Sequence, residues 1–172
     1  MRRFAKFLAA PALAAGLGLT AVPATAAAAP AAPPGRCLSQ QLTLTAQYEG
    51  GAAGTTGIWI LYTNNGSTCT LRGYPGVSAL GTAGRILGSP AGRDPVYPVT
   101  TQLLKHGWSV MSLILLGDVY NYPAAQCQPA KGAAFRVYPP GAYNADTAAY
   151  TFEACRKPGI VYMHTSAVFK TP

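Results

Sequence analysis

Charged residues are scarce in this chain, and acidic residues are the scarcest of all. Only 10% of the 172 residues are charged, and 5 acids stand against 13 lysines and arginines. Globular domains usually carry about 25% charged residues. The chain also holds 19 glycines and 15 prolines. This composition excludes a long charged helical bundle or coiled coil, which needs abundant Glu, Lys and Arg. Hydrophobic residues make up 49% of the chain, enough to form a core and to argue against disorder throughout.

Motifs for catalysis are lacking as well. The serines include no Gly-x-Ser-x-Gly elbow, and no glycine-rich stretch ends in the Lys-Ser/Thr of a phosphate-binding loop. The acids that follow the N-terminal region show no spacing that suggests the facing pair of a glycosidase; they are Glu49, Asp94, Asp118, Asp146 and Glu153. We therefore expect no catalytic residue, no cofactor and no enzyme. A secreted hydrolase with an unrecognised site is the alternative.

Two histidines, His106 and His164, are the only imidazoles in the chain. Met163 next to His164 raises the question of a copper site, but neighbouring side chains of a strand point to opposite faces and cannot readily share a metal. We assign Met163 to the core, His164 to the surface and His106 to a turn, and we predict no metal site. The same alternation groups the last strand into two faces: Val161, Met163, Ala167 and Phe169 on one, and Tyr162, His164 and Ser166 on the other.

One apolar segment stands apart at the N-terminus. Residues 7–22 follow the basic Arg2, Arg3 and Lys6 and precede the small residues 24–26, Ala-Thr-Ala. This order is typical of a Sec-type signal peptide, and the run stops short of the about 20 residues that a spanning helix needs. We expect residues 1–26 to be the signal peptide, cleaved near Ala26. The paired arginines leave twin-arginine export as an alternative.

Export then divides the chain into a tail and one domain. We expect residues 27–36 to be a flexible Ala/Pro tail and residues 37–172 to form a single domain without a transmembrane span. Cys37 follows Pro-Pro-Gly-Arg instead of the apolar run, so lipid acylation is not expected and the mature protein is predicted to be secreted. Cleavage would lower the net charge from +8 to +5, because Arg2, Arg3 and Lys6 leave with the signal peptide.

Four cysteines fit this exported location: Cys37, Cys69, Cys127 and Cys155. An even number in an exported chain predicts two disulfides, for which three connectivities exist. We favour Cys37–Cys69 and Cys127–Cys155, which join near neighbours, and a cross-pair such as Cys37–Cys155 stays open. Loops of this length would each stabilise the fold by roughly 3–4 kcal/mol. A zinc site is the rival interpretation, but the chain has no C-x-x-C spacing.

Alternating apolar and polar residues predict strands over most of the domain. Leu42, Leu44, Ala46 and Tyr48 form the apolar face of one strand, and residues 58–62 are apolar on both faces, as in an inner strand. Further strands are expected near residues 71, 77–80, 85–87, 108–116, 135–138 and 160–169. Residues 50–54 are expected to form a flexible glycine-rich loop and 64–66 a turn, and only 143–154 allow a turn of helix. About seven to nine short strands predict an all-β, antiparallel β-sandwich.

Two strings of residues in this pattern resemble the signature of a known family. Residues 63–66 (Thr-Asn-Asn-Gly) and 69–77 (Cys-Thr-Leu-Arg-Gly-Tyr-Pro-Gly-Val) resemble a secreted actinobacterial family, domain of unknown function 4232. Residues 54–57 and 137–141, Gly84, Gly88 and the four cysteines fit the same pattern, over roughly 37–169. The resemblance implies an exported immunoglobulin-like β-sandwich with no established activity, and it supplies no catalytic residues. Residues 105–107 (Lys-His-Gly) depart from the Pro-Gly turn expected there, and the acylation motif of many relatives is absent.

Tyrosines near prolines are the remaining suggestive pattern, at Tyr97, Tyr120, Tyr122, Tyr138 and Tyr143. Rings held at the end of a sandwich offer a large contact area with a polar tip. We therefore interpret the chain as a non-catalytic binding or surface-interaction module of the cell envelope or culture medium. Its partner would be a cell-wall polymer, a glycan or a protein. Packing of these rings over the sandwich ends, and a structural envelope component without a defined ligand, are the alternatives.

Positive charge is dispersed along the chain instead of gathered on one segment. Nucleic-acid binders usually cluster lysines and arginines on one surface, so we expect no nucleic acid as a partner. A net charge of this size predicts a weak, salt-sensitive attraction to acidic wall polymers, lipids or glycans.

Overall fold

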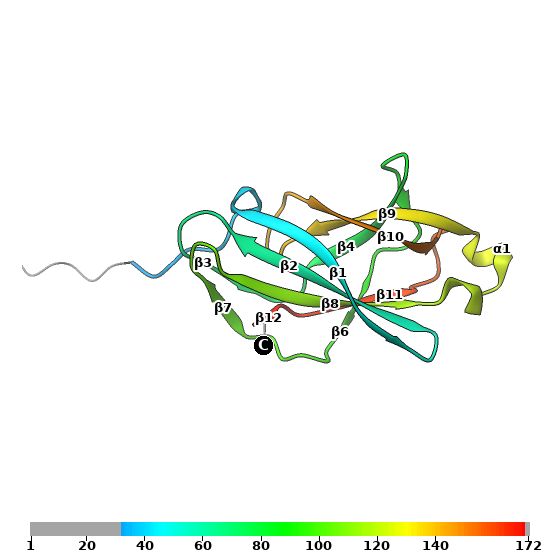
Figure 1. Cartoon of the computed structure of the whole chain (residues 1–172), viewed down its shortest axis with the longest axis horizontal. Coiled ribbons are helices and arrows are strands. Elements are labelled where there is room, and N and C mark those ends of the chain that lie inside the picture. The colour runs from blue at the N-terminus through cyan, green and yellow to red at the C-terminus, as the bar shows by residue number, and fades with distance from the viewer. Residues whose placement is uncertain (1–31, 171–172) are drawn as a thin grey trace, which may run out of the picture. The chain divides into compact units, whose positions relative to one another are not determined.

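A computed structural model describes residues 32–170 of the chain (Figure 1). The predicted signal peptide, residues 1–26, and residues 27–31 of the predicted tail lie outside the described residues. Strands make up 55% of the structure and helix 7%, which confirms an all-β fold. Within residues 32–170, no helix has the length and apolar character needed to span a membrane.

The larger sheet contains six strands built around one long apolar strand. Its order is β1 (Leu42–Ala52), β2 (Thr55–Asn64), β8 (Ser109–Gly117), β11 (Met163–Ser166) and β6 (Gly92–Asp94), and β12 (Phe169–Lys170) also pairs with β8. The pairs are antiparallel except for β11 and β6, which run parallel. β8 thus lies at the centre of the sheet, and most of its side chains are buried.

The second sheet contains four strands, in the order β10 (Asp146–Cys155), β9 (Pro129–Tyr138), β4 (Gly76–Gly81) and β5 (Ile86–Leu87). A two-stranded ribbon joins β3 (Cys69–Arg72) to β7 (Thr101–Leu104). The described part of the chain also contains three short helices: η1 (Ser39–Gln41), η2 (Val119–Asn121) and α1 (Ala124–Cys127). Between residues 32 and 170 there are twelve strands instead of seven to nine, because several pairings involve only two to four residues.

The core lies between the two larger sheets. Side chains from both sheets form one buried cluster, which includes Ile58, Ile60 and Ile114 from the first sheet and Val77, Phe135 and Phe152 from the second. The rings of Phe135 and Phe152 stack with centroids 4.4 Å apart. Burial of these apolar surfaces is the dominant favourable contribution to folding, and the arrangement is the expected β-sandwich.

The pairing of the four cysteines is confirmed as Cys37–Cys69 and Cys127–Cys155. The first disulfide lies beside residues that the sequence assigned to the flexible tail. The amide of Thr70 donates to the carbonyl of Gly35, and Arg36 forms a parallel bridge with Thr70. Gly35 and Arg36 are therefore held against β3, and the folded domain begins before Cys37.

The glycine-rich stretch 50–54 is not the flexible loop that was expected. β1 continues to Ala52 and β2 begins at Thr55, so only Ala53 and Gly54 form the turn. Both have positive φ angles, 45° and 80°, as a two-residue type I′ turn requires. Tyr48 was expected on the core face, but it is 62% exposed, because β1 is an edge strand and a bulge follows Tyr48 in the hairpin.

The helical turn that the sequence allowed within 143–154 is also absent. Residues 146–155 form β10, which pairs with β9, and Ala148, Phe152 and Ala154 face the core. A bulge lies between Ala149 and Phe152 in the pairing with β9, but the alternation of buried and exposed side chains continues through it. The strand pattern is therefore present in the sequence, and the helical turn allowed here was wrong.

The two faces predicted for residues 161–169 are correct for Met163, which is buried, and for His164, which is exposed. They are wrong for Tyr162 and Ser166, each 1% exposed, and for Val161, which is 46% exposed. The strand begins only at Met163, and the carbonyl of Tyr162 just before it accepts a hydrogen bond from the amide of Gly117. The buried hydroxyl of Ser166 accepts from the amide of Leu113 and donates to the carbonyl of Ala167.

Candidate functional site

The five candidate tyrosines lie in three separate places. Tyr138 and Tyr143 line one groove at the C-terminal end of β9. Tyr120 lines a cavity beside β10, and Tyr122 follows directly after η2 and packs against the core. Tyr97 stacks on Phe169 with ring centroids 3.9 Å apart. Only Tyr138 and Tyr143 are brought together in one site.

The groove with these two tyrosines has a volume of about 560 Å³. β9 contributes Arg136 and Tyr138, which alternate with the buried Phe135 and Val137 and so lie on the outer face of the sheet. The guanidinium carbon of Arg136 lies 5.0 Å from the centroid of the Tyr138 ring. A cation over an aromatic face is attracted by the ring quadrupole, and this contact holds both side chains in place.

The other side of the groove comes from the loop of residues 139–145, here called the 139–145 loop, and from the start of β10. Tyr143 is 96% exposed, and Asn144, Asp146 and Thr147 also line the groove. The hydroxyl of Ser39 donates to the carbonyl of Asn144 at 2.8 Å, and the amide of Ala142 donates to the carbonyl of Pro139 at 2.9 Å. The first bond ties the loop to η1 and the second closes a turn within the loop, so the backbone that carries Tyr143 is held in place.

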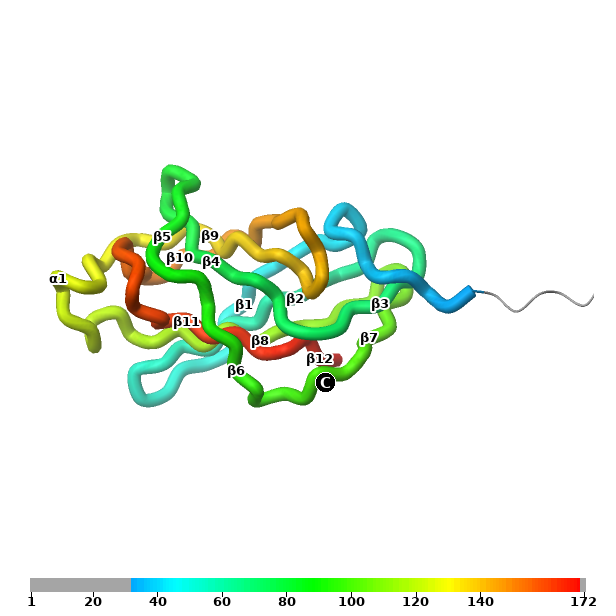
Figure 2. Tube along the Cα trace, turned by 180° about the vertical axis from the view of Figure 1, so that it is seen from behind, coloured from blue at the N-terminus to red at the C-terminus, as the bar shows by residue number. Residues whose placement is uncertain are grey.

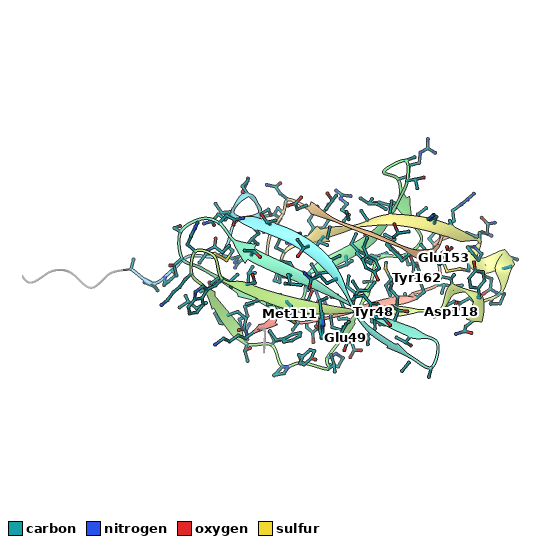
Figure 3. The ribbon with its side chains drawn as sticks, viewed as in Figure 1. Tyr48, Glu49, Met111, Asp118, Glu153 and Tyr162 are labelled. Atoms are coloured by element: carbon teal, nitrogen blue, oxygen red, sulfur yellow. A yellow bond between two sulfur atoms is a disulfide. The ribbon has the colours of Figure 1, made fainter. Side chains whose placement is uncertain are left out.

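A second cavity, of about 530 Å³, lies between the β1–β2 hairpin, η2 and β10. Its apolar part includes Ile58, Leu116 and Phe152, and two carboxylates, Asp118 and Glu153, line it as well. Figure 3 shows both acids at the end of the sandwich that carries α1. Asp118 also accepts a hydrogen bond from the amide of Tyr120 and so caps η2.

This meeting of two acids was missed from the sequence. Asp118 and Glu153 are far apart along the chain, and they line one cavity because η2 packs against β10. No spacing rule connects two residues on separate elements of a sandwich. Their only signal in the sequence is that acids are rare, with five in the chain.

The two histidines occupy the places expected for them. The amide of Trp108 donates to the carbonyl of Lys105, and Gly107 has a φ of 78°, so residues 105–108 form a turn despite the missing proline. His106 lies in this turn, with its Nδ1 3.3 Å from the carbonyl oxygen of Gly66. Within residues 32–170, no group of three or more His, Cys, Asp or Glu side chains has an arrangement that could hold a metal ion.

The comparisons with known proteins give one match. A family model described as Domain of unknown function (DUF4232) matches residues 37–167. This range includes the groove, the cavity and all four cysteines. No curated protein and no solved structure matches the chain.

Proposed function

The chain belongs to this family of domains of unknown function, and we propose that it is an exported, non-catalytic module that binds a glycan in the groove of Tyr138 and Tyr143. The observation that carries the proposal is the nearly complete exposure of Tyr143, 96%, on a loop tied by hydrogen bonds. Burying such a ring against a ligand gains apolar contact area without a large loss of conformational entropy.

The lining of the groove fits a sugar better than a wholly apolar ligand. An aromatic face can stack on the C–H groups of a sugar ring, and its tyrosine hydroxyl remains available for hydrogen bonds. Arg136, Asn144 and Asp146 supply donors and acceptors along the same groove. Ligand sites combine apolar or aromatic area with a few polar groups that fix orientation, and the cell-wall polymers outside the cell offer such ligands.

Retention on purified cell-wall glycan tests the proposal. The Tyr143→Ala protein should bind about two- to tenfold more weakly, since stacking of one ring contributes on the order of 0.5–1.5 kcal/mol. Tyr48→Ala is the matched control, because Tyr48 is also exposed, at 62%, and lines neither the groove nor the second cavity. If the Tyr143→Ala and wild-type proteins are retained equally, the groove is not the glycan site and the proposal is wrong.

Export is part of the same proposal. The two disulfides form stably outside the reducing cytoplasm, and the basic and apolar residues at the N-terminus have the order of a signal peptide. The protein recovered from the medium should lack residues 1–26 by intact mass and should contain no free thiol. A full-length chain that stays with the cells would contradict export.

Hydrolysis is the second candidate function, and the shared cavity of Asp118 and Glu153 is the observation that favours it. Two carboxylates on one cavity are the groups that glycoside hydrolysis uses, one as acid and one as base or nucleophile. Turnover of wall glycans that is lost in the Glu153→Gln protein would establish this function. Absence of turnover, together with glycan binding that depends on Tyr143, would contradict hydrolysis and support the non-catalytic binding module.

A further inference from the structure

A third concavity lies beside the 139–145 loop and differs from the groove in its charge. It has a volume of about 340 Å³ and is lined by Arg36, Thr70, Arg72, Thr101 and Gly141. Two of these five residues are arginines and none is acidic. In a chain with few charged residues, two guanidinium groups on one small concavity are a marked local concentration of positive charge.

The backbone places these two arginines next to each other. Arg36 is bridged to Thr70, and Arg72 follows Thr70 by two residues on the same, outward face of β3. Arg36 and Arg72 are therefore diagonal neighbours, a relationship that long side chains can span. Thr101 lies directly opposite Arg72 in the pairing of β3 with β7. Figure 2 shows the segment that contains Arg36 beside β3.

Arg36 is fixed in this position from both ends. Its neighbour Cys37 is joined to Cys69 on β3, and the amide of Cys37 donates to the carbonyl of Thr70 at 2.9 Å. The guanidinium Nη1 donates to the carbonyl of Gly141 at 3.2 Å. Gly141 has a φ of 72°, and a Cβ at this position would lie 2.7 Å from Nη1 of Arg36. A glycine at 141 therefore leaves the space that the arginine occupies.

The remaining donors suit a phosphate group. A guanidinium has five N–H donors, and the bond to Gly141 uses only part of those on Arg36. Arginine forks bind the oxygens of a phosphate in pairs, and these charge-assisted bonds are stronger than neutral ones. The hydroxyl of Thr101 adds a donor, whereas that of Thr70 already donates to the carbonyl of Gly35. Two adjacent like charges also repel each other, and a bound anion would remove that repulsion.

We propose that the concavity of Arg36, Arg72 and Thr101 binds the phosphate group of a phosphodiester ligand. Two sources carry this group outside the cell, a phosphate-containing wall polymer and a phospholipid headgroup. The proposal does not depend on the glycan groove, because it involves different residues, although both sites border the 139–145 loop.

Titration of the mature protein with inorganic phosphate, followed by amide chemical shifts, tests the site. The wild-type protein should show one saturable site around Arg72, with an affinity that falls as sodium chloride is added. Arg72→Gln should weaken binding at least tenfold, and Arg72→Lys should weaken it less but measurably, because lysine keeps the charge and loses the fork. Arg85→Gln is the matched control: it removes the same charge from an exposed position outside the concavity.

The outcomes separate a built site from general attraction. Equal losses in Arg72→Gln and Arg85→Gln, or shifts that never saturate, would overturn the proposal. Cosedimentation with phosphatidylglycerol vesicles and with a glycerol phosphate polymer then distinguishes the two sources, and a loss in Arg72→Gln on either one supports the site. Tyr143→Ala should leave phosphate binding unchanged, so failure of the glycan proposal and failure of this one give different results.

Discussion

The hydroxyl oxygens of Tyr62 and Ser112 lie 3.0 Å apart in the interior of the sandwich, and both side chains are fully buried. Tyr62 is on β2 and Ser112 on the neighbouring β8, so the bond joins two central strands by their side chains. Tyr162 is the contrasting case, because its buried hydroxyl has no hydrogen-bond partner among the described residues. The backbone of Cys155 lies near enough to influence this hydroxyl but does not reach hydrogen-bond geometry.

Replacing one partner of the buried pair should therefore destabilise the fold. Ser112→Ala leaves the hydroxyl of Tyr62 unsatisfied, and we expect the free energy of unfolding to fall by about 1–3 kcal/mol. Tyr162→Phe removes a hydroxyl that already lacks a partner and should change stability little. Urea denaturation with the disulfides intact measures both, and the Tyr62→Phe/Ser112→Ala double variant should lose less than the sum of the single variants. A large loss in Tyr162→Phe would show that its hydroxyl has a partner.

The same two tyrosines predict how stability depends on alkaline pH. Burial raises the pKa of the Tyr62 phenol well above its usual value, and the hydrogen bond between Tyr62 and Ser112 offsets only part of this. Burial also raises the pKa of Tyr162 to about 12. Since free tyrosine titrates near pH 10, the unfolded chain releases these protons while the folded protein keeps them. Stability should then fall as pH rises above about 10, by at most about 1.4 kcal/mol per pH unit for each tyrosine.

Urea midpoints measured from pH 8 to pH 11 check this dependence. The Tyr162→Phe protein should show a shallower decline than the wild-type protein, because one of the two groups is removed. A midpoint that stays constant through pH 11 in the wild-type protein would mean that folding raises the pKa of neither phenol.

The strands with regular alternation were predictable from the sequence. Leu42, Leu44 and Ala46 face inward as their spacing indicates, and the apolar residues 58–62 lie in an inner strand. The favoured disulfide pairing of near neighbours is also confirmed, although the sequence left a cross-pair open. In each case the signal is local, and the tertiary structure did not override it.

Two errors concern the end and the type of an element. The residues of β10 do alternate, with Ala148, Phe152 and Ala154 buried, but alanines are also good helix formers and the segment was allowed a helical turn. Tyr162 lies just outside the strand whose period was applied to it. The candidate sites could not be assembled from the sequence either. The sequence named Tyr138 and Tyr143 but could not bring them to one groove, and it could not bring Arg36 to Arg72, because strand pairing decides both.

Two glycines of the β4–β5 region should respond differently to the same substitution. Gly84 and Gly88 both have positive φ angles, 71° and 60°, a region that costs an L-residue about 1–2 kcal/mol. A Cβ at Gly84 meets nothing within 4 Å, whereas a Cβ at Gly88 would lie 2.5 Å from the carbonyl oxygen of Cys155. Backbone at this distance cannot move aside as a flexible side chain can.

We therefore expect Gly88→Ala to lower the free energy of unfolding by more than Gly84→Ala. The difference should be about 1–3 kcal/mol, the usual range for overpacking in a closely packed region. Thermal unfolding of the two proteins with the Cys127–Cys155 disulfide intact provides the measurement. Equal midpoints would show that Gly88 tolerates a side chain and that only its φ angle matters.

The β1–β2 hairpin offers a substitution that should stabilise the protein. Ala53 occupies the first turn position with a φ of 45° and is followed by Gly54. Asparagine tolerates this left-handed conformation better than alanine, and Asn-Gly is a preferred type I′ pair. Ala53→Asn should raise the free energy of unfolding by about 0.5–1 kcal/mol and slow the hydrogen exchange of the amides that pair the hairpin, including that of Thr55.

Ala52→Asn, one residue earlier on β1, is the control and should bring no gain, because β-strands disfavour asparagine. If residues 50–54 formed the flexible loop that their glycines suggest, both substitutions would leave exchange unchanged, so protection that appears only in Ala53→Asn distinguishes a defined turn from a loop.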